Sequence, residues 1–82
     1  MAIRIGAHVN QALDAGAPVL ALESTIITHG LPRPRNLEVA LSSEAELRAQ
    51  GVTPATIGVL DGTPVVGCTT EELIRLALRF LA

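Results

Sequence analysis

The sequence has no lysine, tryptophan or tyrosine, and it has only one phenylalanine and one cysteine among its 82 residues. Arginine supplies all six basic side chains, and the formal net charge is −2. A nucleic-acid-binding surface needs a dense basic patch, which this composition does not provide. Bases also need aromatic side chains on which to stack, and Phe80 stands alone. We therefore expect no nucleic-acid partner.

The scarcity of cysteine and histidine limits metal and disulfide chemistry. Cys68 has no second cysteine with which to form an internal disulfide or a Cys-x-x-Cys metal motif. His8 and His29 are far apart in the sequence, and no cysteine spacing supports them as a zinc site. We expect no metal ion to be bound by this chain alone.

Long apolar runs are also missing. No run approaches the roughly 20 residues that a membrane-spanning helix needs. The first six residues lack the basic segment and long apolar core of a signal peptide. The chain is nevertheless 49% hydrophobic, which is too apolar for a disordered segment. We expect a soluble, cytoplasmic chain that makes no membrane contact and forms at most one domain.

In the first half of the chain, the hydrophobic pattern predicts a helix, a strand and a second helix. Helical spacing over residues 3–15 ends at Gly16, which suits the left-handed backbone after a helix. Residues 19–22 are a continuous apolar run, typical of a strand covered on both faces. Residues 24–35 favour a long loop, because Gly30, Pro32 and Pro34 interrupt regular structure. Asn36 is a suitable N-cap for a helix that continues to Gln50.

The second half predicts two strands and a final helix. Asp61-Gly62 separates the β-prone segments 55–60 and 63–67 and is typical of a tight hairpin. Thr69 and Glu72 have the spacing of a capping box before an apolar helix that reaches Ala82. The fold class is therefore α/β. We expect part of an α/β/α sandwich, with one βαβ unit, a short hairpin strand and flanking helices.

Glu23 is the strongest catalytic candidate, because it follows four apolar residues at the carboxyl end of the predicted strand. Ligands of open α/β sheets bind outside these strand ends. A carboxyl group that is partly desolvated there holds its proton more strongly and can act as a general acid. The structural alternative is that Glu23 caps nearby backbone amides or pairs with Arg33 or Arg35.

The loop after Glu23 gathers hydroxyl groups and a histidine, which invites a nucleophile–base interpretation for Ser24 and His29. No Gly-x-Ser-x-Gly elbow supports that interpretation, and turn hydrogen bonding explains the hydroxyls more simply. Arg33 and Arg35 could clamp a phosphate or could be solvated loop residues. Cys68 is expected to be a small buried residue, and Asp61 is expected to be a turn residue.

The sequence around Glu23 resembles a known motif. The segment Ala21-Leu22-Glu23-Ser24-Thr25-Ile26-Ile27-Thr28-His29-Gly30-Leu31-Pro32 is similar to the opening signature of the pseudouridine-5′-phosphate glycosidases, the indigoidine-synthase-A-like family. The likeness continues to about Leu76 through Asn36, Gln50-Gly51, Pro54-Ala55-Thr56-Ile57, Asp61-Gly62, Val66-Gly67 and Glu71-Glu72-Leu73.

The resemblance implies a reversible cleavage of the C–C glycosidic bond of pseudouridine 5′-phosphate, which gives uracil and ribose 5-phosphate. It implies an α/β/α fold, a homotrimer, a lysine Schiff base to a ring-opened sugar, and a divalent metal, typically manganese, held by an aspartate. The family's glutamate proton donor matches Glu23. Thr25 and His29 lie in the same motif and are weaker candidates for substrate binding.

The resemblance does not supply a complete catalytic site. The sequence contains no lysine, and Asp14 and Asp61 do not match the metal-binding position. We therefore interpret residues 1–82 as the incomplete amino-terminal part of a glycosidase-like domain, inactive alone. Two alternatives stay open: half of a split enzyme joined to a downstream remainder, or a non-catalytic α/β interaction module that binds through its apolar last helix. An autonomous hydrolase based on Ser24 and His29 ranks far below these.

Overall fold

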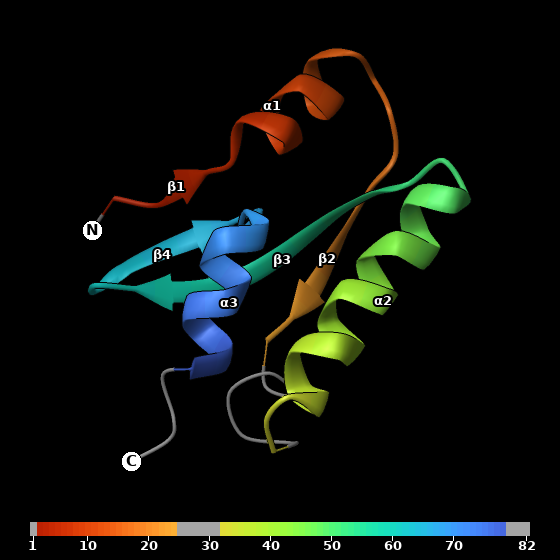
Figure 1. Ribbon diagram of the computed structural model, residues 1–82. Helices are drawn as coiled ribbons and strands as arrows, with labels where there is room; N and C mark the ends of the chain where they lie inside the picture. The colour runs from red at the N-terminus through yellow and green to blue at the C-terminus, as the bar shows by residue number, and fades with distance from the viewer. Residues whose placement is uncertain (1, 25–31, 79–82) are drawn as a thin grey trace.

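The computed structural model describes residues 2–24 and 32–78, which form a mixed four-stranded sheet with helices packed on it (Figure 1). The strand order is β1-β4-β3-β2, which confirms the α/β class. Along the chain the described elements are β1 (Arg4–Ile5), α1 (Ala7–Asp14), β2 (Val19–Glu23), α2 (Arg35–Ala49), β3 (Thr53–Leu60), β4 (Thr63–Val66) and α3 (Thr70–Leu78).

The predicted βαβ unit is present as β2, α2 and β3. The two strands pair in parallel, from Val19 opposite Thr53 to Glu23 opposite Ile57. Because parallel neighbours cannot be joined by a tight turn, the connection has to cross over, and α2 lies within that crossover. Gly51 follows α2 with φ +79°, which confirms its predicted place after the helix.

The hairpin between β3 and β4 forms at Asp61-Gly62, as predicted. Both residues have positive φ, +52° and +78°, as a type I′ turn requires. The strands pair antiparallel from Leu60 opposite Thr63 to Ile57 opposite Val66. Pro64 lies near the start of β4, before the residues of β4 that pair with β1. Its missing N–H therefore costs no bond to β1.

The amino terminus differs from the sequence prediction. Residues 3–15 do not form one helix, because Arg4 and Ile5 pair in parallel with Val65 and Val66 of β4. The Gly6 N–H also donates to the Val66 carbonyl at 2.8 Å. Helix α1 begins only at Ala7. The partner strand lies about 60 residues away in the sequence, so local periodicity contains no sign of it.

Helix α2 also differs in detail. Asn36 is not the N-cap, since Arg35 is already helical and the N-cap position belongs to Pro34, which makes no side-chain capping bond. Instead Asn36 is buried, and its Nδ2 donates to the Ala77 carbonyl of α3 at 3.1 Å. The apolar Ala45 is exposed, while the charged Glu44 takes a buried position. The inward-facing residues are Asn36, Ala40 and Glu44, four apart.

Helix α3 begins with the predicted capping box. The Glu72 N–H donates to Thr69 Oγ1 at 3.2 Å, and the Thr69 N–H donates to Glu72 Oε1 at 2.9 Å. Leu73, Leu76 and Ala77 are buried, whereas Ile74 and Leu78 are exposed. The predicted extension of this helix to Ala82 lies outside the described residues.

The main core lies on one face of the sheet, under α2 and α3. It contains the buried residues Ala40, Leu60, Val65, Cys68, Leu73, Leu76 and Ala77. Ala55 is also buried but lies outside this cluster, and α1 contacts β3 and β2. Strand β2 was expected to be covered on both faces, and it is not. It is an edge strand of the described sheet, and Leu20 is 47% exposed.

None of the helices within residues 2–24 and 32–78 has the length and apolar content needed to cross a membrane.

Candidate functional site

Glu23 is the last residue of β2, at the carboxyl end of the strand, where the sequence placed it. Its neighbour Leu22 pairs with Thr56, and the Thr56 hydroxyl points to Glu44 on α2. Successive side chains of a strand point to opposite faces. Glu23 and its partner Ile57 therefore lie on the face opposite α2 and α3.

Glu23 shares that face with exposed apolar side chains. Ile57 is 39% exposed and Val59 is 55% exposed, and both alternate with the buried Gly58 and Leu60 of β3. We call Glu23, Ile57 and Val59 the open face. Glu23 is itself exposed, so the expected partial desolvation of its carboxyl group does not occur among the described residues. Its chemical role stays a prediction.

The other candidates of the same motif are only partly described. Thr25, Thr28 and His29 lie outside the described residues, so their predicted substrate or turn roles stay predictions. Ser24 is half-buried at the end of β2. Arg33 is exposed, and Arg35 is an exposed residue whose Nη1 lies 3.8 Å from Glu38 Oε1. Both predicted alternatives for these arginines, a phosphate clamp and solvated loop residues, stay predictions.

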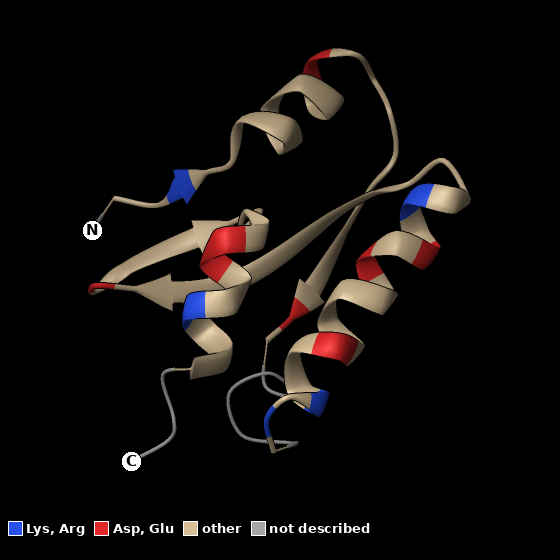
Figure 2. Ribbon diagram, viewed as in Figure 1, with Lys and Arg blue, Asp and Glu red and all other residues tan. Residues whose placement is uncertain are grey.

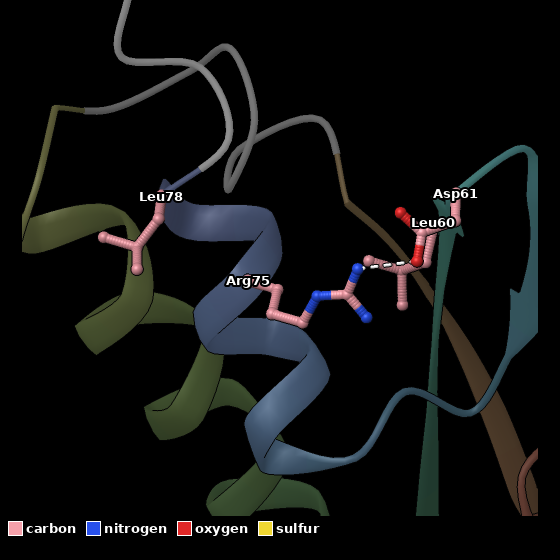
Figure 3. A pocket seen from close by; sticks show the side chains of 4 residues that line it. All are labelled: Leu60, Asp61, Arg75 and Leu78. Carbon is pink, nitrogen blue, oxygen red and sulfur yellow. Dashed lines mark hydrogen bonds and ion pairs between the residues drawn. The ribbon is translucent and has the colours of Figure 1, made fainter.

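Charged side chains do not gather into a basic patch in the described part of the chain. Figure 2 shows acidic and basic positions interspersed along α2 and α3. Asp61, at the hairpin turn, forms an ion pair with Arg75, whose Nη2 lies 2.7 Å from Asp61 Oδ2. Both residues line a pocket of about 290 Å³ together with Leu60 and Leu78 (Figure 3). Both charged side chains are largely exposed, so this pair stabilises the fold only weakly.

A second hollow lies between the edge strand and α2. It has a volume of about 400 Å³, and its walls combine leucine side chains with polar groups of α2. Leu20 and Leu22 line it from β2, and Ser42, Ser43, Glu46 and Leu47 line it from α2. Leu20 and Leu22 are apolar, so the hollow is further evidence that α2 covers β2 incompletely.

Sequence reasoning missed the buried carboxylate Glu44. Its side chain is almost fully buried, and Oε2 accepts a 2.6 Å hydrogen bond from the Thr56 hydroxyl. Oε1 accepts a 3.1 Å bond from Arg48 Nη2, one turn along the helix. A buried carboxylate needs such partners to offset its desolvation. The four-residue spacing of Glu44 and Arg48 indicated an ion pair but not its burial. Glu44 faces inward because it lies on the same side of the helix as the buried Asn36 and Ala40.

Cys68 is buried, as predicted, and it is not a nucleophile. Desolvation by burial, reinforced by the negative charge of Glu72, raises the pKa of the thiol to about 11. The reactive form of cysteine is the thiolate. At neutral pH Cys68 therefore stays protonated and serves as a small core residue.

The described residues do not fit a metal site. No three His, Cys, Asp or Glu side chains lie close enough to hold an ion within residues 2–24 and 32–78. A divalent metal held by carboxylates needs several such oxygen ligands.

Comparison with known proteins gives consistent matches. The family described as "Indigoidine synthase A like protein" matches residues 8–80. A pseudouridine-5′-phosphate glycosidase of Saccharopolyspora erythraea is 67% identical over 73 residues, covering 89% of this chain and 24% of that protein. One of a Roseiflexus species is 53% identical, covering 94% of this chain and 25% of that protein. The chain thus spans about a quarter of the length of the relatives it matches.

Two solved structures share the fold. The crystal structure of an indigoidine synthase A-like protein from Thermotoga maritima superposes with a TM-score of 0.75 at 31% identity, covering 94% of this chain and 25% of that one. A prealnumycin C-glycosynthase, crystallised with ribulose 5-phosphate, gives a TM-score of 0.72 at 36% identity, covering 93% and 24%.

Proposed function

Because the chain belongs to the indigoidine synthase A-like family, we propose that it is part of a pseudouridine-5′-phosphate glycosidase domain. The observation that carries this proposal is the 67% identity to a glycosidase of that name over most of the chain. Since the chain spans about a quarter of such relatives, the activity is proposed for the complete domain. The 82 residues alone are expected to be inactive.

The proposed substrate class is a C-glycoside of a pentose 5-phosphate. Relatives named for pseudouridine 5′-phosphate support it, because that nucleotide joins uracil to ribose 5-phosphate through carbon. The prealnumycin C-glycosynthase supports it independently, because its name specifies a C-glycosidic bond and its structure contains ribulose 5-phosphate. Both names thus point to the same type of bond and to a five-carbon sugar phosphate.

Glu23 is proposed as the proton donor. When the C–C bond breaks, the electron pair stays on the uracil ring carbon, which must gain a proton to leave as uracil. A carboxylic acid at a strand end can deliver that proton. Thr25 and His29, next in the motif, are proposed to bind substrate.

The remaining parts of the catalytic site are proposed to come from family residues that this chain does not contain. The Schiff-base lysine implied by the resemblance has no counterpart here, because the sequence has no lysine. The metal-binding aspartate is likewise proposed to lie outside these residues, with manganese as the ion. Trimeric assembly and a cytoplasmic location complete the proposal.

The test is a hybrid enzyme. The matched segment of this chain replaces its counterpart in the Saccharopolyspora erythraea glycosidase, and uracil release from pseudouridine 5′-phosphate is measured. We expect the hybrid to be active and Glu23→Gln to lower kcat by about 100- to 10,000-fold, the usual contribution of a general acid. Glu71→Gln, an exposed carboxylate on α3, is the matched control and should leave turnover unchanged. If Glu23→Gln left the kcat of the hybrid unchanged, Glu23 would not be the proton donor.

A second candidate function is an interaction module that binds through α3. The exposed Ile74 and Leu78, 38% and 49% accessible and one turn apart, favour it. If Ile74→Ser and Leu78→Ser together left the sizing profile and every binding property of the chain unchanged, this candidate would fail.

A further inference from the structure

Thr56 lies where several parts of the fold meet, beside the strand end that carries the proposed acid. Its hydroxyl donates to Glu44 of α2 at 2.6 Å. Its carbonyl accepts two backbone hydrogen bonds of 3.0 Å, from the N–H groups of Gly67 and Cys68 just after β4. In the sheet it pairs with Leu22 of β2. Strand β3 is thus bonded at this residue to α2 and to the segment after β4, opposite the last apolar residue of β2.

The contact between Thr56 and Glu44 is buried, and stability alone does not account for it. Both side chains are only 2% exposed. Removing a carboxylate from water opposes folding, and well-packed apolar side chains in place of a buried ionic contact are often as stabilising. The best-attested use of such a contact is to select one arrangement of the elements that it joins. We therefore looked for an arrangement that depends on it.

The register of β2 is such an arrangement, because the strand's own pattern does not specify it. Residues 19–22 are all apolar, so the two faces of the strand are alike. A slip of one residue against β3 would turn every side chain of β2 to the opposite face. Glu23 would then leave the open face for the side of α2. In the observed register Leu22 lies opposite Thr56, and Glu23 therefore lies opposite Ile57.

Helix α2 connects the buried contact to β2. Leu20 and Leu22 of β2 line the same hollow as Ser43 and Leu47 of α2, on either side of Glu44 in the helix face. The packing of the two leucines on α2 relates β2 to the helix, and the Glu44 carboxylate relates the helix to β3. Together these contacts define where β2 ends against β3.

We propose that Thr56, held by Glu44, is a positioning residue for Glu23. The buried hydrogen bond anchors α2 to β3, and α2 sets the register of β2, so that the proton-donating carboxyl group lies at the strand end on the open face. Thr56 itself is buried on the opposite face and acts only through Glu23. This inference rests on the proposed function, since it assigns Thr56 a role in the proton transfer proposed for Glu23.

Kinetics of the hybrid enzyme test this role. Thr56→Val removes the hydroxyl and keeps the shape of the side chain. A displaced acid loses an interaction made only in the transition state, so kcat and kcat/KM should fall together while KM stays within about twofold. We expect kcat to fall by about 10- to 100-fold, the effect of a displacement on the order of 1 Å. Thr56→Ser, which retains the hydroxyl, should recover most of the lost kcat.

Leu60→Ala is the control for a loss of stability alone. Leu60 is buried on the same face of β3 but at its far end, where it pairs with Thr63 beside the hairpin. All variants are assayed at a temperature at which circular dichroism shows them to be folded. Leu60→Ala should leave kcat nearly unchanged. Equal losses of kcat in Leu60→Ala and Thr56→Val would overturn the proposal.

A double variant tests whether Thr56 acts through Glu23. In the hybrid that carries Glu23→Gln, the group that Thr56 positions is already absent. Adding Thr56→Val should therefore change kcat by less than about twofold, because two residues that act as a unit have non-additive effects. If the two losses multiplied instead, Thr56 would act independently of Glu23 and the proposal would be wrong.

Hydrogen exchange in the 82-residue chain separates positioning from function, because it needs no activity. We expect the backbone amides of residues 19–23 to exchange faster in Thr56→Val than in Leu60→Ala, after correction for the free energy of unfolding of each variant. Equal corrected rates would contradict the anchoring of β2 through Thr56. A hybrid without substitutions that releases no uracil would contradict the proposed glycosidase instead, and the exchange result would still decide the anchoring.

Discussion

The Thr56 hydroxyl on β3 donates a 2.6 Å hydrogen bond to the buried carboxylate of Glu44 on α2. This contact joins the middle of the βαβ unit to its second strand, and Arg48 completes it from the next helical turn. Because Glu44 is buried, its carboxylate needs this partner when α2 packs on the sheet. The contact therefore links α2 to β3 through a buried, hydrogen-bonded carboxylate.

Thr56→Val should test this contact. Valine keeps the shape of threonine but cannot donate, so Glu44 loses one of its two described partners. Hydrogen bonds to charged groups contribute about 1.5–3 kcal/mol, and we expect the free energy of unfolding to fall by about 2 kcal/mol in urea titrations followed by circular dichroism. Thr63→Val in β4 is the matched control and should change it by less than about 0.5 kcal/mol. Equal losses from both would contradict the role of the hydroxyl.

Asn36→Ser distinguishes two roles of one residue. Serine is as good an N-cap as asparagine, so a capping role predicts almost no change. The structure instead has Asn36 reaching the Ala77 carbonyl of α3, a span too long for serine. We expect a loss of about 1–2 kcal/mol in the free energy of unfolding. Asn36→Gln, which keeps the amide but alters its reach, is an informative second variant. Full stability of Asn36→Ser would restore the capping interpretation.

The Glu72 carboxylate should give the fold a dependence on acid pH. Burial alone would raise its pKa, but the Thr69 N–H, the positive charge of Arg4 and the Thr69 hydroxyl outweigh burial and lower the pKa below its ordinary 4.5. A carboxylate with a lowered pKa adds stability above its unfolded-state pKa, and this stability is lost as the pH falls through the folded-state value. Urea midpoints at about pH 6 and about pH 3 should therefore differ less in Glu72→Gln than in the unchanged chain. Glu71→Gln, on the same turn but outside the capping box, should keep the original difference.

Gly6→Ala should separate β1 and α1 from β4. Gly6 has ordinary dihedral angles, but a Cβ there would overlap the backbone carbonyl of Gly67. Backbone cannot move aside as a side chain can, so we expect a loss of about 2–3 kcal/mol or more. At Gly58 the nearest atom to an added Cβ is a Leu76 methyl at 2.7 Å, which can shift. Gly58→Ala should therefore cost less in the same urea titration, and the reverse order would contradict the close approach of Gly6 to Gly67.

Features set by neighbouring residues were predictable from the sequence. Asp61-Gly62 sets its turn by its own backbone preference, and Thr69 and Glu72 cap α3 across three residues. Strand β1 was not predictable, because a two-residue strand forms only through pairing with Val65 and Val66. Asn36 and Glu44 were misjudged or missed for the same reason, since their partners Ala77 and Thr56 belong to other elements.

The candidate site shows a similar division. The position of Glu23 at the end of β2 follows from the four apolar residues before it, and the structure confirms that position. Its exposure was not predictable, because solvent access depends on which elements cover the sheet. A run such as Val19–Leu22 indicates a strand suited to burial but contains no information about whether the covering residues belong to the same chain.

The pairing of β1 with β4 also sets the order in which the chain can fold as it is synthesised. Residues 4–5 are synthesised about 60 residues before their hydrogen-bonding partners at 65–66. Until then the start of the chain has nowhere to dock, while β2, α2 and β3 can already assemble. Contacts between distant segments form late because closing a long loop is entropically costly. Residues 4–5 therefore join the sheet only after β2, α2 and β3 can have assembled.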